Sequence, residues 1–155
     1  DLVMTAHILY KKIDSENPAT LSPTFLQKVL RQDLKYRGLV ITDDLGMKAL
    51  TSRYSREEIA VRALQAGCDI LLYCNEFDAP PVGLKAVEAA LADGRLHAEQ
   101  LEESVEKIVQ LKNEFVVNCE PLPLKEASQI IGHPDHLKLA KAITDGEIPE
   151  DLKTT

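Results

Sequence analysis

Two adjacent carboxylates lie near the middle of the chain, directly after an apolar run. Asp43 and Asp44 follow residues 39–41, which are all apolar. If that run is a buried strand of a parallel sheet, the two side chains stand at the edge where ligands bind. A carboxylate held there is suited to nucleophilic or acid–base chemistry. An Asp at a strand-to-helix turn is also a good N-cap. From the residues alone both roles stay open for Asp43, and capping is favoured for Asp44.

Two other polar residues end apolar runs in the same way. His7 follows the run 2–6, and Asn75 comes soon after the run 69–73. Because the carboxyl ends of parallel strands meet at one edge of a sheet, we expect both residues to lie beside Asp43 as candidate substrate contacts. For His7 the alternative is a structural role, as a hydrogen-bonded side chain at the end of a strand.

Amphipathic segments between the apolar runs indicate helices, and the runs themselves indicate buried parallel strands. One helix is predicted to begin at Ser22-Pro23, where Ser is the N-cap and Pro the first helical residue. Another is predicted over residues 55–66, with Ser55 and Glu58 as a capping box and Gly67 at its end. The order strand, helix, strand, helix, strand is typical of an α/β fold.

The spacing of the strands matches a barrel of βα units. The strands begin at residues 2, 39 and 69, which is close to the roughly 31 residues per unit of an eight-unit barrel of about 250 residues. Three strands do not close such a barrel. The predicted fold is therefore α/β, a portion of a (β/α)8 TIM-type barrel with three parallel βα units.

The chain after the third strand is predicted to be helical. Its amphipathic segments are residues 81–92, 97–115, 124–131 and 136–143. A break at 120–123 contains two prolines, and the polar tail from residue 148 is expected to fray. We therefore place the barrel portion at residues 1–115 and a helical C-terminal extension at residues 116–155.

The composition is that of a soluble globular domain. The 155 residues are 45% hydrophobic and 28% charged, and 18 Lys+Arg against 25 Asp+Glu give a net charge of -7. This acidic balance argues against a nucleic-acid partner, and no apolar run reaches the roughly 20 residues of a membrane helix. Cys68, Cys74 and Cys119 are odd in number and lack C-x-x-C spacing. We expect reduced thiols of a cytoplasmic protein, with Cys68 and Cys74 as small core residues.

The order and spacing of several motifs resemble glycoside hydrolase family 3. The motifs are Val3-Met4-Thr5-Ala6-His7-Ile8-Leu9-Tyr10, Ser22-Pro23, Leu30-Arg31-Gln32-Asp33-Leu34 and Gly38 to Met47. Within that family they are similar to the bacterial β-N-acetylglucosaminidases that act in peptidoglycan recycling. The match covers roughly residues 2 to 75 and implies the C-terminal part of the family's barrel, strands six to eight. The Asp-Asp-Leu-x-Met form favours the hexosaminidase branch over the β-glucosidase branch.

The resemblance implies a role for each candidate residue. In this family the first Asp of the pair, here Asp43, attacks the anomeric carbon, and water hydrolyses the resulting glycosyl-enzyme ester. Asp44 is then expected to cap the next helix and organise the turn. His7, Met47 and Asn75 are candidate substrate contacts, with a core role as the alternative for Met47. The implied substrate is a terminal β-linked N-acetylglucosamine of peptidoglycan fragments or chitooligosaccharides, and neither a metal nor an organic cofactor is implied.

The chain also departs from the family pattern. The family's general acid/base is a His on a long loop after an earlier strand, and His97, His133 and His136 lie in helical stretches that do not match it. A metal site at His133-Pro134-Asp135-His136 is disfavoured because no further ligand is in sight. We therefore expect these residues alone to be inactive and to need the missing N-terminal half of the barrel. The alternatives are a β-glucosidase or xylosidase of the same family, and a non-catalytic structural or interaction module.

Overall fold

The chain divides into two compact units, Asp1–Val117 and Asn118–Thr155. The computed structural model describes residues 2–116 and 120–147. The second unit consists of two short helices, α5 (Leu124–Ile130) and α6 (Pro134–Asp145), which confirms the two helices predicted in that part of the sequence. The first unit holds the strands and every candidate site residue.

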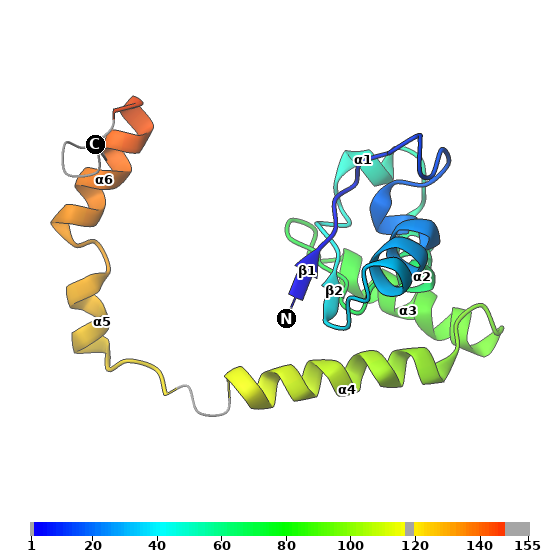
Figure 1. Cartoon of the computed structure of the whole chain (residues 1–155). Helices are drawn as coiled ribbons and strands as arrows, with labels where there is room; N and C mark the ends of the chain where they lie inside the picture. Colours follow the sequence, from blue (N-terminus) through cyan, green and yellow to red (C-terminus); the bar gives the residue numbers. More distant parts are fainter. Residues whose placement is uncertain (1, 117–119, 148–155) are drawn as a thin grey trace. The chain divides into compact units, whose positions relative to one another are not determined.

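Two short parallel strands form the sheet of the first unit. β1 (Leu2–Met4) and β2 (Leu39–Ile41) lie side by side, with Val3 opposite Val40 (Figure 1). The connection between them contains a 3-10 helix, η1 (Ala19–Leu21), and a π-helix, η2 (Thr24–Asp33). A helix was predicted at the position of η2, although with ordinary α-helical hydrogen bonding.

The third predicted strand, residues 69–73, is reduced to a single parallel bridge between Ile41 and Ile70. The segment still follows β2, because the N–H of Thr42 donates to the carbonyl of Ile70 at 3.0 Å. The next bond along this segment goes to a side chain instead of a backbone carbonyl: the N–H of Leu72 donates to the Oγ1 of Thr42 at 2.9 Å. The prediction of three parallel βα units is therefore not confirmed, because the described part of the chain forms two parallel strands.

β1 is exposed along its whole length, which contradicts the buried strand predicted at its position. The exposed fractions of Leu2, Val3 and Met4 are 46%, 38% and 54%. Successive side chains of a strand point to opposite faces of the sheet, so both faces of β1 are open. Its second edge pairs with no strand among the described residues. The apolar sequence predicted burial, but burial depends on a covering element that these residues do not supply.

The helix α2 (Arg56–Ala66) begins and ends as predicted. The Oγ of Ser55 accepts the N–H of Glu58 at 3.2 Å, and Gly67 ends the helix with a φ of 112°, which favours glycine. The remaining helices of this unit are α1 (Lys48–Thr51), α3 (Ala79–Ala92) and α4 (Ala98–Phe115). α3 and α4 lie where the sequence predicted helices. Local signals were thus sufficient for these helices.

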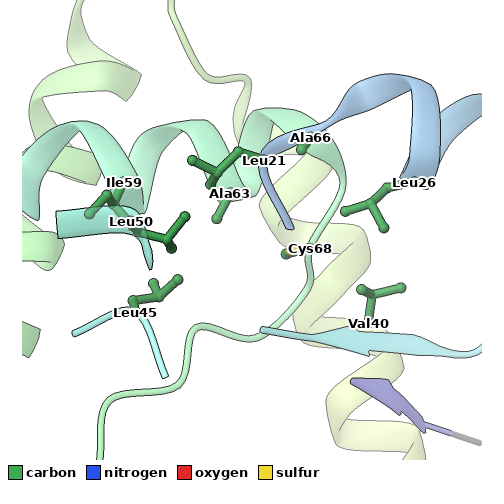
Figure 2. Close-up of a cluster of buried hydrophobic side chains, with 9 residues drawn as sticks. All are labelled: Leu21, Leu26, Val40, Leu45, Leu50, Ile59, Ala63, Ala66 and Cys68. Carbon is green, nitrogen blue, oxygen red and sulfur yellow. The ribbon is translucent and has the colours of Figure 1, made fainter. Parts of the chain in front are cut away.

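The hydrophobic core lies between β2 and the helices on one side of it. Its buried residues are Leu21, Leu26, Val40, Leu45, Leu50, Ile59, Ala63, Ala66 and Cys68. Figure 2 shows these side chains, among them Leu45, Leu50 and Ile59 of the same buried cluster. Leu45 belongs to the turn after β2, so the turn that follows the two carboxylates is anchored in the core. Burying one such leucine contributes about 1.5–3 kcal/mol.

Asp69 joins three segments of the first unit through a buried carboxylate. Its Oδ2 accepts hydrogen bonds from the Nη2 of Arg31 and the backbone N–H of Val40, both at 2.8 Å. Its Oδ1 accepts the hydroxyl of Ser104 at 2.7 Å, and the Nζ of Lys107 lies 3.8 Å away. The side chain of Asp69 is only 5% exposed. A charge in such surroundings is tolerated because each oxygen has a cation or a hydrogen-bond donor beside it.

Replacing Asp69 by Asn should destabilise the protein strongly. The substitution leaves the largely buried Arg31 without its counterion and brings an amide NH2 among donors, so the expected loss is about 3–5 kcal/mol of unfolding free energy. The measurement is urea unfolding of the whole protein followed by circular dichroism. The control is Asp33→Asn, because Asp33 pairs with Lys28 while both side chains are more than half exposed. That loss should be about 0–1 kcal/mol. Equal losses for the two variants would show that Asp69 is not the anchor described here.

Candidate active site

Asp43 stands at the carboxyl end of β2. It is half-buried, whereas Thr42 before it is fully buried. The Oδ1 of Asp43 accepts the backbone N–H of Asp44 at 2.8 Å, and its Oδ2 accepts no hydrogen bond from the described residues. The N-cap role that the residues left open does not hold, because the N-cap position of α1 is Met47 and no side chain caps that helix. One oxygen of Asp43 is oriented by the backbone while the other remains available.

Asp44 is buried and serves the turn rather than a helix. Its Oδ1 accepts the N–H of Gly46 at 3.0 Å and that of Cys74 at 3.2 Å, while its Oδ2 accepts the amide of Asn75 at 3.2 Å. The N–H of Gly46, assisted by the other donors, holds the pKa of Asp44 below its ordinary value against the opposing effect of burial. The predicted helix cap is wrong, since Asp44 lies several residues before α1. The predicted role in organising the turn is confirmed.

His7 is hydrogen-bonded through both of its ring nitrogens. Its Nε2 lies 2.9 Å from the backbone carbonyl of Asp44, and its Nδ1 lies 2.8 Å from the Oγ1 of Thr20. That hydroxyl is also 2.8 Å from the Oγ1 of Thr5. This is the structural alternative raised from the sequence. A contact between His7 and a substrate stays a prediction, and it would have to displace one of these partners.

Met47 and Asn75 are both exposed, Met47 in the turn after β2 and Asn75 in the turn that follows the 69–73 segment. Met47 is 43% exposed, so it is not the core residue that was considered as an alternative. Asn75 is exposed and linked to the turn through Asp44. The neighbouring Glu76 pairs with the Nη2 of Arg56 at 2.9 Å. The structure therefore brings His7, Met47 and Asn75 to the turn that carries Asp43, as the positions of the strands predicted.

The two described cysteines differ in their surroundings. Cys68 is a buried core residue, as predicted, and burial raises the pKa of its thiol to about 12. Cys74 is exposed, so its predicted place in the core is wrong. The reason is that Cys74 belongs to the turn beyond the 69–73 segment, where its N–H bonds to Asp44. Cys119 lies outside the described residues.

Thr20 is a site residue that the sequence did not reveal. It is fully buried in η1 and bonds to both Thr5 and His7. It lies between the first predicted strand and the helix predicted from Ser22, and the only signal was the short apolar setting of Ala19-Thr20-Leu21 after Pro18. In the same connection the carboxylate of Asp14 organises the loop after β1. It accepts hydrogen bonds from Ser22, Glu16 and Asn17.

Other features of the described residues lie apart from this turn. A cavity of about 560 Å³ between α2 and α3 is lined by residues such as Val61, Val82 and Ala86 and does not include Asp43. The described residues contain no cluster of three or more His, Cys, Asp or Glu side chains that could hold a metal ion. None of the described helices combines the length and apolar character that a membrane span requires.

The sequence matches a known protein family over most of its length. Residues 1–111 fit the family described as Glycosyl hydrolase family 3 N terminal domain. A beta-hexosaminidase of Nitrosomonas eutropha is 37% identical over 112 residues, which cover 70% of this chain and 32% of that protein. The chain spans about a third or less of the length of the curated relatives it matches.

Solved structures give the same likeness. A glycoside hydrolase family 3 beta-N-acetylglucosaminidase from Paenibacillus sp. has a TM-score of 0.75 and 35% identity, covering 79% of this chain and 24% of that one. Beta-glucoside phosphorylase BglX has a TM-score of 0.74 and 28% identity, covering 94% of this chain and 28% of that one. These neighbours imply a (β/α)8 barrel domain.

Replacing Ser22 by Ala should raise the pKa of Asp14. That pKa is lowered from 3.8 to about 2, chiefly by the hydroxyl of Ser22 at 2.6 Å and further by the N–H groups of Asn17 and Glu16. A carboxyl whose folded pKa is depressed stabilises the fold above its unfolded pKa, and this stability is lost as the pH falls from about 4 to about 2. In the variant this loss of stability should be smaller, because the pKa of Asp14 in the folded protein lies closer to its unfolded value.

The measurement is the carboxyl carbon shift of Asp14 followed by NMR between pH 1.5 and 5, together with unfolding over the same range. Ser15→Ala is the matched control, because the Oγ of Ser15 donates to Glu16 rather than to Asp14. Ser22 also accepts the N–H of Phe25, so a loss of stability alone would not decide the point. An unchanged pKa of Asp14 in Ser22→Ala would contradict the prediction.

Proposed function

Because the chain belongs to glycosyl hydrolase family 3, we propose that it supplies the nucleophile of a retaining glycoside hydrolase and that Asp43 is this nucleophile. The observation that carries the proposal is the placement of Asp43 at the carboxyl end of β2, half-buried. One of its oxygens is oriented by the backbone, and the other accepts no hydrogen bond from the residues that the structure describes. Ligands of parallel βα folds bind at this end of the strands.

The reaction follows from a carboxylate in this position. An oxygen of ionised Asp43 attacks the anomeric carbon while an acid outside these residues protonates the departing glycosidic oxygen. The product is a glycosyl ester on Asp43. Water, deprotonated by the same acid/base group, then attacks the anomeric carbon and releases the sugar with retained configuration. Asp44 cannot take this role as readily, because its oxygens are already occupied by the donors of Gly46, Cys74 and Asn75.

The proposed substrate is a glycan with a terminal β-linked N-acetylglucosamine, such as a peptidoglycan fragment or a chitooligosaccharide. Support comes from the relatives named beta-hexosaminidase and beta-N-acetylglucosaminidase. Met47 and Asn75 are the proposed sugar contacts, because both are exposed, Met47 in the turn that carries Asp43 and Asn75 bonded to Asp44 of that turn. No cofactor is needed for this chemistry. We further propose a cytoplasmic location and a role in peptidoglycan recycling.

A second candidate is an enzyme of the same family that acts on a β-glucoside or β-xyloside. The observation that favours it is the likeness to a beta-glucoside phosphorylase, which extends over 94% of the chain. The two candidates differ at C2 of the sugar, where one carries an acetamido group and the other a hydroxyl. Parallel assays of the whole protein with the two aryl glycosides, with and without phosphate, separate hydrolysis of either sugar from phosphorolysis. A protein inactive in all of these assays would favour a structural or interaction module.

The proposal also includes a structural partner, the N-terminal half of the barrel. We place these residues in the C-terminal part of the domain. In support, β1 exposes both faces and an unpaired edge, as a strand does when its neighbour in a barrel is missing. The acid/base group is proposed to lie in that other half.

A fluorinated substrate should label Asp43 in the whole protein. A 2-fluoro or 5-fluoro glycoside slows hydrolysis of the ester, so the glycosyl-enzyme accumulates and peptide mass spectrometry locates it. Asp43→Asn should abolish labelling and lower turnover by at least about 10³-fold, as expected for loss of a covalent nucleophile. Asp33→Asn is the control, because Asp33 is an exposed carboxylate on η2. A label on any other carboxylate would refute the assignment.

The 155 residues alone should show no glycosidase turnover and should associate with themselves. The acid/base group is absent from the proposed half-barrel, and open strand edges pair with other chains. The measurements are an aryl glycosidase assay and size-exclusion chromatography with light scattering. Val3→Lys on β1 should reduce self-association, whereas Phe77→Lys, which replaces a residue that is 95% exposed outside the strands, should not. Hydrolysis of the aryl glycoside by the purified 155-residue chain would contradict this prediction.

A further inference from the structure

We infer that His7 is a positioning residue which holds the turn of the nucleophile through the backbone of Asp44, rather than a contact to the substrate. The inference rests on the proposed function of Asp43. It starts from the geometry of the imidazole, whose two nitrogens are both engaged by protein atoms. A side chain in this state orients its neighbours and has no ring nitrogen left for a sugar hydroxyl.

The partners of His7 determine which nitrogen carries the proton. The Nε2 lies 2.9 Å from the carbonyl oxygen of Asp44, and a carbonyl can only accept, so the Nε2 must donate. In the neutral imidazole the Nδ1 is then an acceptor and takes the hydroxyl proton of Thr20. Thr20 has no second proton, so the hydroxyl of Thr5 donates to it. Thr20 is fully buried, so this chain of hydrogen bonds fixes the ring without help from solvent.

Asp44 transmits the position of His7 to the nucleophile. Three groups of this residue are engaged at once: its carbonyl by His7, its carboxylate by the donors of the 74–75 turn, and its N–H by the Oδ1 of Asp43. The residue is only 8% exposed. Its carboxylate stays ionised because the N–H of Gly46 and the other donors lower its pKa. Without His7 the carbonyl of Asp44 would keep only the N–H of Met47, at 3.1 Å and within the same turn. The bond that ties this turn to the end of β1 would be lost, which would allow the N–H that orients Asp43 to shift.

A substrate ligand and a positioning residue leave different kinetic signatures. Loss of a ligand weakens ground-state binding and raises KM or the inhibition constant of the free sugar. Loss of a positioning residue leaves binding nearly intact but misplaces the attacking oxygen, which lowers kcat and the rate of ester formation. A misplacement of about 1 Å can cost on the order of 100-fold in rate.

The test compares His7→Leu with His7→Gln in the whole protein. Gln carries an N–H at nearly the reach of the Nε2 and can still donate to the carbonyl of Asp44, whereas Leu cannot. We expect Leu to lower kcat and the labelling rate by a fluoro glycoside by roughly 10- to 100-fold. The inhibition constant for N-acetylglucosamine should change by less than about 2-fold, and Gln should recover most of the rate. His97→Leu is the matched control, since His97 is exposed at the start of α4 and caps nothing.

Hydrogen exchange gives a second readout that does not depend on catalysis. Peptides spanning residues 39–47 should exchange faster in His7→Leu than in the wild type or in His7→Gln. If His7→Leu does not fold, Thr20→Val takes its place, because it removes the hydroxyl that orients the ring at nearly constant volume. It should lower kcat and speed the same exchange without changing the inhibition constant.

Two results would overturn the inference. One is a raised inhibition constant with kcat intact in both His7 variants, which would make His7 a substrate contact. The other is unchanged exchange and unchanged kcat in His7→Leu. A wild-type protein that is never labelled at Asp43 contradicts the proposed function instead, and the exchange measurement still decides whether His7 holds the turn.

Discussion

The segment at residues 69–75 is held beside β2 and its following turn by backbone and side-chain hydrogen bonds together, and the first unit depends on this. The backbone carbonyl of Val40 accepts the N–H groups of Asp69 and Ile70. Side chains add three further bonds. Asp69 accepts the N–H of Val40, Thr42 accepts the N–H of Leu72, and Asp44 accepts the N–H of Cys74. Two backbone strands would meet these needs with a ladder of amides. Here a short stretch of backbone pairing is supplemented by an oxygen from each of these three side chains, so polar side chains help to fix the distance between the two turns of the site.

This arrangement explains which elements could be predicted from the sequence. α2 was predicted from Ser55 and Gly67 because its cap and its end are local, set by residues within a few positions. The third strand was predicted from its apolar run but is reduced to a single bridge. Local composition did not reveal that side chains of Thr42 and Asp44, about 30 residues away, bond to the N–H groups of this segment. The predicted burial of β1 is wrong for a related reason. An apolar strand is buried only where another element packs against it, and hydrophobicity alone does not show whether such an element is present.

The same distinction applies to the site. The type and position of Asp43 could be read from a carboxylate placed after a buried strand. The full structural role of Asp44 could not be predicted in this way, because its partners at residues 74 and 75 are distant in sequence. A local rule assigned it to a helix cap instead. Thr20 left almost no signal, as a single hydroxyl in a loop looks alike whether it is buried or exposed. Asp69 was likewise counted only as the first residue of a strand.

The two neighbouring carboxylates acquire different roles from their surroundings. They are chemically identical and adjacent, yet Asp44 points into a buried set of donors that keeps it ionised. Asp43 is half-buried and has one oxygen with no partner among the described residues. A nucleophilic carboxylate needs a rigidly held backbone and an available oxygen. One residue cannot easily provide both when its oxygens must also satisfy buried donors. The pair divides these requirements: Asp44 takes the hydrogen bonds that make the turn rigid, which leaves Asp43 available for chemistry.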